Sequence, residues 1–191
     1  METGGSHGLS VECGNCYSKP RTPYYQGLSL PSLPLLSVNQ PLISFLKIGR
    51  FDLLEAVAKP LACTDFVRVE VNRPREELDN ALARGGITEI PLTDPQQLLE
   101  VEKLYEKGLG RGEASSIVLA QQQGYELILD DKKARKLAAA RNISLYSTSD
   151  IIIQNIKMGQ LTLAEADSFI TVWQSMGEFP VSCKTFRDLL S

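Results

Sequence analysis

The sequence is almost without histidine. The only one, His7, lies in a head that is rich in Gly and Ser. Ser-His-Asp and Cys-His catalytic groups need a histidine held by packed structure, and zinc sites built on histidine need several. Any catalysis in the folded part of the chain must therefore use carboxylates, Lys, Tyr, Cys or a metal held by oxygen ligands.

Long apolar runs and an excess of positive charge are also missing. The segment 28–36 is the nearest to a membrane span, but it is short and broken by Pro31 and Pro34, whereas a span needs about 20 apolar residues. We therefore expect no signal peptide and a cytoplasmic protein. The net charge of -3 gives no basic field that would attract nucleic acid, so local groups would have to do so.

Cysteine is scarce, with 4 in the chain. Cys13 and Cys16 have CxxC spacing, but a second pair is absent because Cys63 and Cys183 are isolated. We interpret all of them as free thiols in a reducing compartment. The alternative for Cys13 and Cys16 is half of a zinc ribbon or a redox pair.

The remaining composition suits one domain with a tail. Residues 1–32 hold many Gly, Ser and Pro and show no apolar periodicity, which predicts a disordered or loosely packed N-terminal extension. Over residues 33–191, short apolar runs alternate with helical patterns, as in βαβ units. We expect an α/β domain with a central, mostly parallel sheet and helices on both faces.

The expected elements follow from periodicity and end signals. Buried strands are expected over 35–39, 87–92, 126–129 and 143–146. Helices are expected over 42–58, with an interruption near 49–50, and over 74–84, 95–106, 113–123, 132–141, 149–157, 162–174 and 183–190. Residues 64–71 fit either a strand or a short helix. Gly108, Gly110 and Gly112 predict a flexible loop, and Tyr105 and Trp173 are expected to pack in the core.

Polar residues occur where two of these strands end. Asn39 ends the first strand, Asp130 and Asp131 follow the strand at 126–129, and Glu113 lies in the first turn of the preceding helix. Ligands of open parallel sheets bind beyond the carboxyl ends of the strands, so we expect these groups at one edge. The alternative is structural: one aspartate caps the next helix, and Glu113 complements a helix dipole.

Several blocks of the chain resemble PIN domains, in particular a bacterial and archaeal subfamily related to VapC-type toxins. The opening block lies within residues 39–54. The most specific block contains Gly112-Glu113-Ala114 and the segment LILDDKKARKLA at 127–138. Residues 159–161 and 186–190 are similar to the C-terminal helices of that subfamily, so the resemblance runs from about residue 35 to the end.

The resemblance implies a metal-dependent endoribonuclease, often the toxin of a two-gene toxin–antitoxin pair. The implied ligands of Mg²⁺ or Mn²⁺ are Asn39, Glu70, Glu113, Asp130 and Asp131. Glu70, Glu113 and Asp130 are the implied catalytic residues. Carboxylate oxygens suit such ions, which polarise phosphate and activate water. The implied partners are an RNA substrate, an antitoxin protein and a second copy of the chain in a homodimer, with no membrane.

Asn39 departs from the family pattern, which has an acidic residue at this position. An amide oxygen binds a metal without contributing charge, so metal affinity should fall. The alternative function is therefore a catalytically impaired PIN fold that serves as a binding or regulatory module. A third possibility is an unrelated α/β protein in which the acids only cap helices.

Basic residues lie beside the predicted acidic edge. Lys132 and Arg135 follow the aspartates at a spacing that puts both on one helix face, so of the basic residues here they are the candidates for contacts with RNA. The alternative is a solvated helix face, or an internal ion pair for Arg135.

Overall fold

A single sheet forms the centre of the computed structural model, which describes residues 34–58, 60–178 and 180–190. The strands have the order β3-β2-β1-β4-β5, and every neighbouring pair is parallel. Their bounds are β1 Leu35–Ser37, β2 Leu61–Thr64, β3 Thr88–Ile90, β4 Glu126–Ile128 and β5 Leu145–Tyr146. The predicted α/β class is confirmed. The predicted extension over 1–32, with His7, Cys13 and Cys16, lies outside the described residues.

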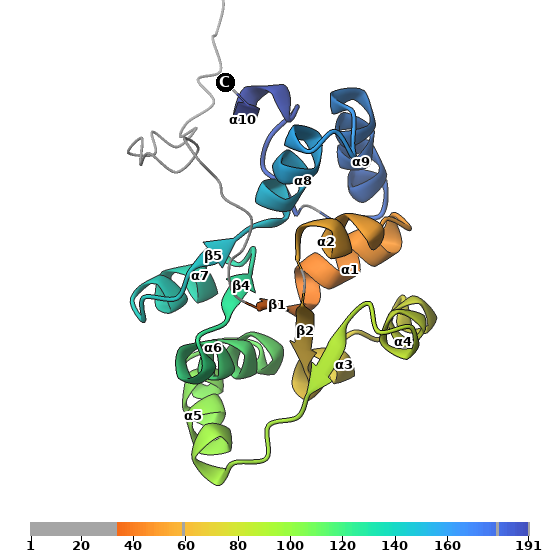
Figure 1. Cartoon of the computed structure of the whole chain (residues 1–191). Helices are drawn as coiled ribbons and strands as arrows, with labels where there is room; N and C mark the ends of the chain where they lie inside the picture. Colours follow the sequence, from red (N-terminus) through yellow and green to blue (C-terminus); the bar gives the residue numbers. More distant parts are fainter. Residues whose placement is uncertain (1–33, 59, 179, 191) are drawn as a thin grey trace, which may run out of the picture.

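Helices connect the strands and cover both faces of the sheet (Figure 1). Their bounds are α1 Asn39–Lys47, α2 Asp52–Val57, α3 Asp65–Glu70, α4 Arg75–Ala83, α5 Pro95–Glu106, α6 Arg111–Gln123, α7 Lys132–Ala139, α8 Thr148–Lys157, α9 Leu163–Ser175 and α10 Arg187–Leu190. In the part of the chain that the structure describes, none of these helices is long and apolar enough to cross a bilayer.

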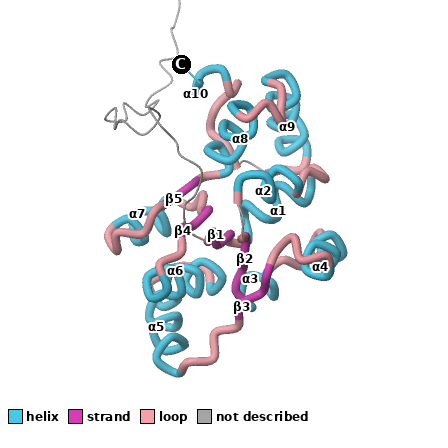
Figure 2. The backbone as a smooth tube through the Cα atoms, in the orientation of Figure 1, coloured by secondary structure: helices cyan, strands magenta, loops and turns pink. Residues whose placement is uncertain are grey.

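The two faces of the sheet belong to two separate apolar cores. Side chains alternate along each strand, so Leu35 packs into the first core and Leu36 into the second. The first core lies under α1, α2, α8 and α9, and the second lies under α5, α6 and α7 (Figures 1 and 2). This burial on both faces explains why the strands read as continuous apolar runs.

Thr64 fixes the point where the sheet meets two helices. It ends β2 and caps α3, because its Oγ1 accepts a hydrogen bond from the backbone N–H of Val67 at 3.2 Å. The same oxygen lies 2.7 Å from Ser115 Oγ, and both side chains are fully buried. A buried hydroxyl pair therefore ties α6 to the start of α3, which brings the two helices together at the carboxyl edge of the sheet.

Several expected elements differ from the observed ones. The strand β2 was not predicted, and residues 64–71 form the end of β2 followed by α3. The segment expected as a buried strand at 87–92 is the edge strand β3, with Thr88 exposed. The predicted helix over 183–190 is only the short α10. Gly112 is not in a loop, because α6 begins at Arg111.

The two aromatic residues predicted in the core behave differently. Trp173 is fully buried, and its Nε1–H donates to the carbonyl oxygen of Ser44 at 2.8 Å, so this prediction is confirmed. Tyr105 is 44% exposed, so its prediction is wrong. Its ring lies near the end of α5, where Arg111 covers one face at 4.2 Å from the centroid.

Candidate functional site

Glu70 joins three segments at the carboxyl edge of the sheet. Its Oε2 accepts a hydrogen bond from Asn39 Nδ2 at 2.9 Å, and its Oε1 accepts one from the backbone N–H of Gly112 at 2.9 Å. The backbone N–H of Gln40 donates to Asn39 Oδ1 at 2.9 Å, which fixes the amide. Asn39 therefore presents its NH₂ group to Glu70, and its oxygen is turned toward the backbone of α1.

Gly112 provides the space in which the Glu70 carboxylate lies. A Cβ atom at this position would be 2.5 Å from Glu70 Oε2, closer than real contacts allow, and 3.1 Å from Val67 Cγ2, which is a tight contact. Glu70 thus lies against the first turn of α6, where free backbone N–H groups and the helix dipole stabilise a negative charge. The sequence pattern suggested this glycine as part of a loop and of the block that resembles PIN domains.

Glu113 lies in the same first turn of α6 and is half-buried. Its Oε2 accepts a hydrogen bond from the backbone N–H of Gly110 at 3.1 Å. Burial raises the pKa of this carboxyl above its usual range, the Gly110 hydrogen bond and the charge of Lys133 oppose the rise, and the charges of Asp131 and Glu70 add to it. Glu113, Asp131 and Glu70 are therefore close enough to share one electrostatic environment.

The two consecutive aspartates point to different partners. Asp131 caps α7, since its Oδ1 accepts from the backbone N–H of Ala134 at 2.8 Å. Asp130 bonds to α8: its Oδ1 accepts from the backbone N–H of Thr148 at 2.8 Å and its Oδ2 from Thr148 Oγ1 at 2.5 Å. Burial raises the pKa of Asp130 to about 6, although the Thr148 bonds and Arg135 lower it and Asp150 adds to the rise. Of the two aspartates, Asp131 is the one whose charge raises the pKa of Glu113.

The donor set of this edge consists of oxygen atoms, which suits a hard divalent cation. Glu70 uses both carboxylate oxygens in bonds to Asn39 and Gly112. Over residues 34–58, 60–178 and 180–190, no group of at least three His, Cys, Asp or Glu residues is arranged to hold one metal ion. The donors fit the ion in chemistry, whereas the ligand roles predicted for Asn39, Glu70, Glu113, Asp130 and Asp131 stay predictions.

The basic residues near this edge mostly hold the backbone in place. Arg135 Nη1 donates to the carbonyl oxygen of Leu129 at 2.6 Å and to that of Tyr146 at 3.0 Å, so it joins the ends of β4 and β5. Lys133 Nζ donates to the carbonyl oxygens of Lys107 and Gly108 in the loop between α5 and α6. Lys132 is exposed at the start of α7. The RNA contacts of Lys132 and Arg135 stay predictions.

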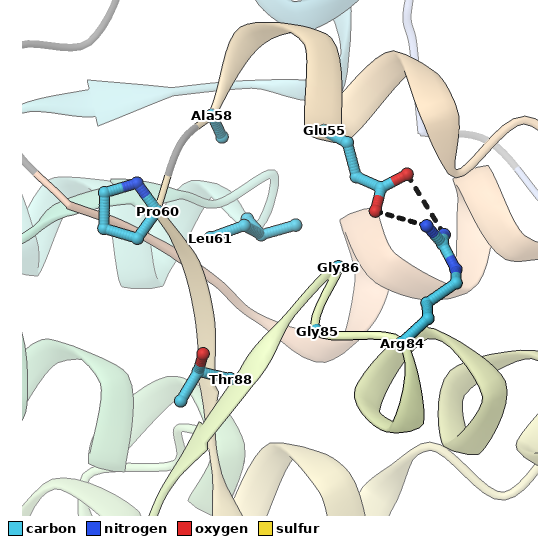
Figure 3. Close-up of a pocket in the computed structure, with 8 residues that line it drawn as sticks. All are labelled: Glu55, Ala58, Pro60, Leu61, Arg84, Gly85, Gly86 and Thr88. Carbon is cyan, nitrogen blue, oxygen red and sulfur yellow. Dashed lines mark hydrogen bonds and ion pairs between the residues drawn. The ribbon is translucent and has the colours of Figure 1, made fainter.

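A cavity of about 560 Å³ lies away from these acids, at the amino ends of β2 and β3 (Figure 3). Its lining comprises Glu55, Ala58, Pro60, Leu61, Arg84, Gly85, Gly86 and Thr88. Arg84 donates to both oxygens of Glu55 at 2.6 and 3.0 Å, so the charged groups of the cavity already neutralise each other. The candidate site is therefore the acidic edge and not this cavity.

The comparison with known families matches the segments that build the acidic edge. A family model described as a PIN domain covers residues 37–190. The chain belongs to the PIN-domain family. The match includes the start of α1, the end of α3, the start of α6 and residues 130–135, and these segments carry every residue predicted for the site. None of the curated proteins compared with this PIN domain is a significant match. The PIN domain is a nuclease-type fold, and this confirms the predicted family.

Proposed function

We propose that this PIN domain is an endoribonuclease that hydrolyses phosphodiester bonds with the help of Mg²⁺ or Mn²⁺. The observation that carries the proposal is the acidic edge, where Glu70, Glu113 and Asp131 come from three helices and interact electrostatically. Glu70 and Glu113 are partly buried and Asp131 is exposed, and a concentration of like charges of this kind costs free energy in the absence of a cation, which is typical of functional sites.

Glu113 and Asp131 are the residues that would hold the ion. Each is tied to a helix start by one oxygen, through Gly110 N–H and Ala134 N–H, so its second oxygen can serve as a ligand. Glu70 would complete the charge of the site from its place between Asn39 and Gly112. A bound divalent cation supplies positive charge that polarises a phosphodiester and activates water.

Glu113 is the member of this set whose charge is most in need of a cation. Burial is the first cause that raises its pKa, and a bound positive charge would offset that effect. We assign Asp130 a different part from the one predicted: through Thr148 it positions the turn that carries Asp131.

The test is cleavage of a structured RNA by the purified chain with and without Mn²⁺. We expect cleavage only with the ion, and a loss of at least about 100-fold in Glu113→Gln and Asp131→Asn, the usual range for a lost acid–base or ligand group. Glu76→Gln, an exposed glutamate in the first turn of α4, is the matched control and should cleave like the wild type. Undiminished cleavage by Glu113→Gln and Asp131→Asn would refute the proposal.

The second candidate is a PIN-fold binding or regulatory module without catalysis. It is supported by Asn39, whose NH₂ group stabilises the Glu70 carboxylate through a hydrogen bond and so reduces the need for a cation. Calorimetric titration with Mn²⁺ separates the two candidates. Heat of binding that disappears in Asp131→Asn supports the nuclease, and no binding in the wild type supports the module.

The finer features implied by the resemblance extend the same proposal. We propose a cytoplasmic toxin of the VapC type that forms a homodimer and binds an antitoxin protein. Light scattering on the purified chain gives its mass in solution and so tests the homodimer. Growth arrest on induced expression, relieved by co-expression of a neighbouring gene, supports the toxin–antitoxin role.

A further inference from the structure

Tyr105 and Arg111 form an exposed stacked pair at the turn between α5 and α6. The guanidinium carbon of Arg111 lies 4.2 Å from the centroid of the Tyr105 ring, which is the distance of face-to-face contact between a cation and an aromatic ring. Tyr105 is 44% exposed, although a tyrosine of an amphipathic helix usually buries its ring. The pair therefore keeps a large flat surface in contact with solvent.

Glu102 holds the plane of Arg111 in a defined orientation. Arg111 Nε donates to Oε1 at 3.2 Å and Nη2 donates to Oε2 at 3.1 Å, a two-point contact that restricts rotation of the guanidinium. Nη1 has no acceptor among the described residues. The side chain of Arg111 is 45% exposed, so both the flat face and this amino group can meet a ligand.

The pair is next to the acidic edge. Arg111 directly precedes Gly112 and Glu113 in the first turn of α6. The pKa of Arg111 is raised, first by the hydrogen bond from its guanidinium to Glu102 and last by the charge of Glu70, so this guanidinium lies within electrostatic range of Glu70. Lys133 fixes the turn from the other side through the carbonyl oxygens of Lys107 and Gly108.

A second pair with similar bonds shows what is distinctive here. Arg84 also lies over an aromatic ring, that of Phe51 at 5.5 Å, and also binds a glutamate through two hydrogen bonds. Phe51 is only 7% exposed, however, so its ring offers no free surface. Of the two pairs, only Tyr105 and Arg111 combine an exposed ring with a position beside the carboxylates.

We propose that Tyr105 and Arg111 form a platform on which an unpaired base of single-stranded nucleic acid stacks, next to the acidic edge. Bases stack on tyrosine rings and on arginine planes largely without regard to sequence, and this supplies affinity that the net charge of -3 does not. The inference rests on the proposed nuclease function, since it names single strands as the substrate class of that site.

The test is fluorescence anisotropy with a labelled oligoadenylate of about ten nucleotides, within the span that one small binding domain covers. Ca²⁺ replaces Mg²⁺ and Mn²⁺ in the buffer, and a gel checks that the oligonucleotide stays intact. The RNA, the DNA of the same sequence and a duplex are compared. We expect both single strands to bind and the duplex to bind more weakly, because its bases are paired and held inside the helix.

Tyr105→Ala should weaken binding by about 5- to 150-fold, the equivalent of one lost base stack, and Tyr105→Phe should restore it because the ring remains. Arg111→Ala should weaken binding as well. Leu99→Ala, another exposed apolar residue of α5, and Arg84→Ala at the opposite edge are the matched controls and should bind like the wild type.

The outcomes separate this platform from the nuclease proposal. Binding that depends on Tyr105 in a protein that cleaves nothing supports the platform and refutes the nuclease. Cleavage of RNA by a Tyr105→Ala protein that binds single strands as well as the wild type overturns the platform and leaves the nuclease intact. Absence of oligonucleotide binding by the wild type also overturns the platform.

Discussion

Replacing Asn39 with aspartate tests how the acidic edge is stabilised. In the wild type, Asn39 Nδ2 donates to Glu70 Oε2 at 2.9 Å. A hydrogen bond to a charged group contributes about 1.5–3 kcal/mol to stability, and the lower end applies because both residues are only partly buried. Asn39→Asp removes the donor and places a second carboxylate at nearly the same distance from Glu70.

The repulsion between the two carboxylates sets the magnitude. At an effective dielectric constant of about 20, two charges about 4 Å apart repel by about 4 kcal/mol. One of the two carboxylates could instead take up a proton, which would remove the repulsion. At neutral pH this protonation costs a similar amount of free energy, because an ordinary carboxyl titrates about 3 pH units lower. An aspartate in the first turn of α1 recovers about 0.3–1 kcal/mol from the helix dipole. The lost hydrogen bond and the repulsion, less the helix-dipole contribution, give an expected net loss of about 4–5 kcal/mol.

Urea unfolding in EDTA at neutral pH measures this loss, with Asn39→Ala as the reference for the hydrogen bond alone. Asn39→Asp should be less stable than Asn39→Ala in EDTA. Saturating Mn²⁺ should stabilise Asn39→Asp more than either the wild type or Asn39→Ala, because the ion screens the new carboxylate pair. An Asn39→Asp protein as stable as the wild type in EDTA, or equal stabilisation of all three by Mn²⁺, would refute the reasoning.

Three other substitutions follow from the same structure. Burial raises the pKa of Asp130 to about 6 in the folded protein, against an ordinary 3.8, so this carboxyl lowers the free energy of unfolding as pH rises between these values. In urea unfolding, Asp130→Asn should therefore gain about 3 kcal/mol relative to the wild type between about pH 4 and pH 7. A difference that stays constant with pH would contradict this. Gly112→Ala should displace the Glu70 carboxylate and cost about 1–3 kcal/mol in thermal unfolding, and a protein as stable as the wild type would count against this close approach. Trp173→Phe leaves the buried carbonyl of Ser44 without its donor and should cost about 1–3 kcal/mol by the same measurement, and an unchanged midpoint would count against that bond.

Local signals in the sequence were enough for most of the fold. Asp94 followed by Pro95 marked the start of α5, and Asp94 Oδ1 does accept from Gln96 N–H at 2.8 Å. The strand β2 was missed because Leu61–Thr64 is short and contains small residues, and its state depends on pairing with β1 and β3 on either side. The same non-local pairing decides that Thr64 ends a strand and begins α3.

The acidic edge was predictable as a region but not in its contacts. The sequence placed Asp130 and Asp131 at the carboxyl end of a strand and Glu113 in the first turn of the preceding helix, yet neighbouring aspartates have the same local pattern. Only the packing of α8 against β5 shows that Thr148 donates hydrogen bonds to Asp130, whereas Asp131 interacts electrostatically with Glu113. Tyr105 was expected in the core because helical periodicity identifies the apolar face of a helix. It does not show where along the helix that face becomes exposed to solvent.

The most direct measurement for the central claim is the Mn²⁺-dependent rate of RNA cleavage by Asp131→Asn compared with Asp130→Asn. The two residues are adjacent in sequence, but their carboxylates have different partners. A functional acidic edge formed by Glu70, Glu113 and Asp131 predicts a loss of at least about 100-fold in Asp131→Asn and retention of most activity in Asp130→Asn. Full activity in Asp131→Asn, or no cleavage by the wild type at any Mn²⁺ concentration, would contradict the account.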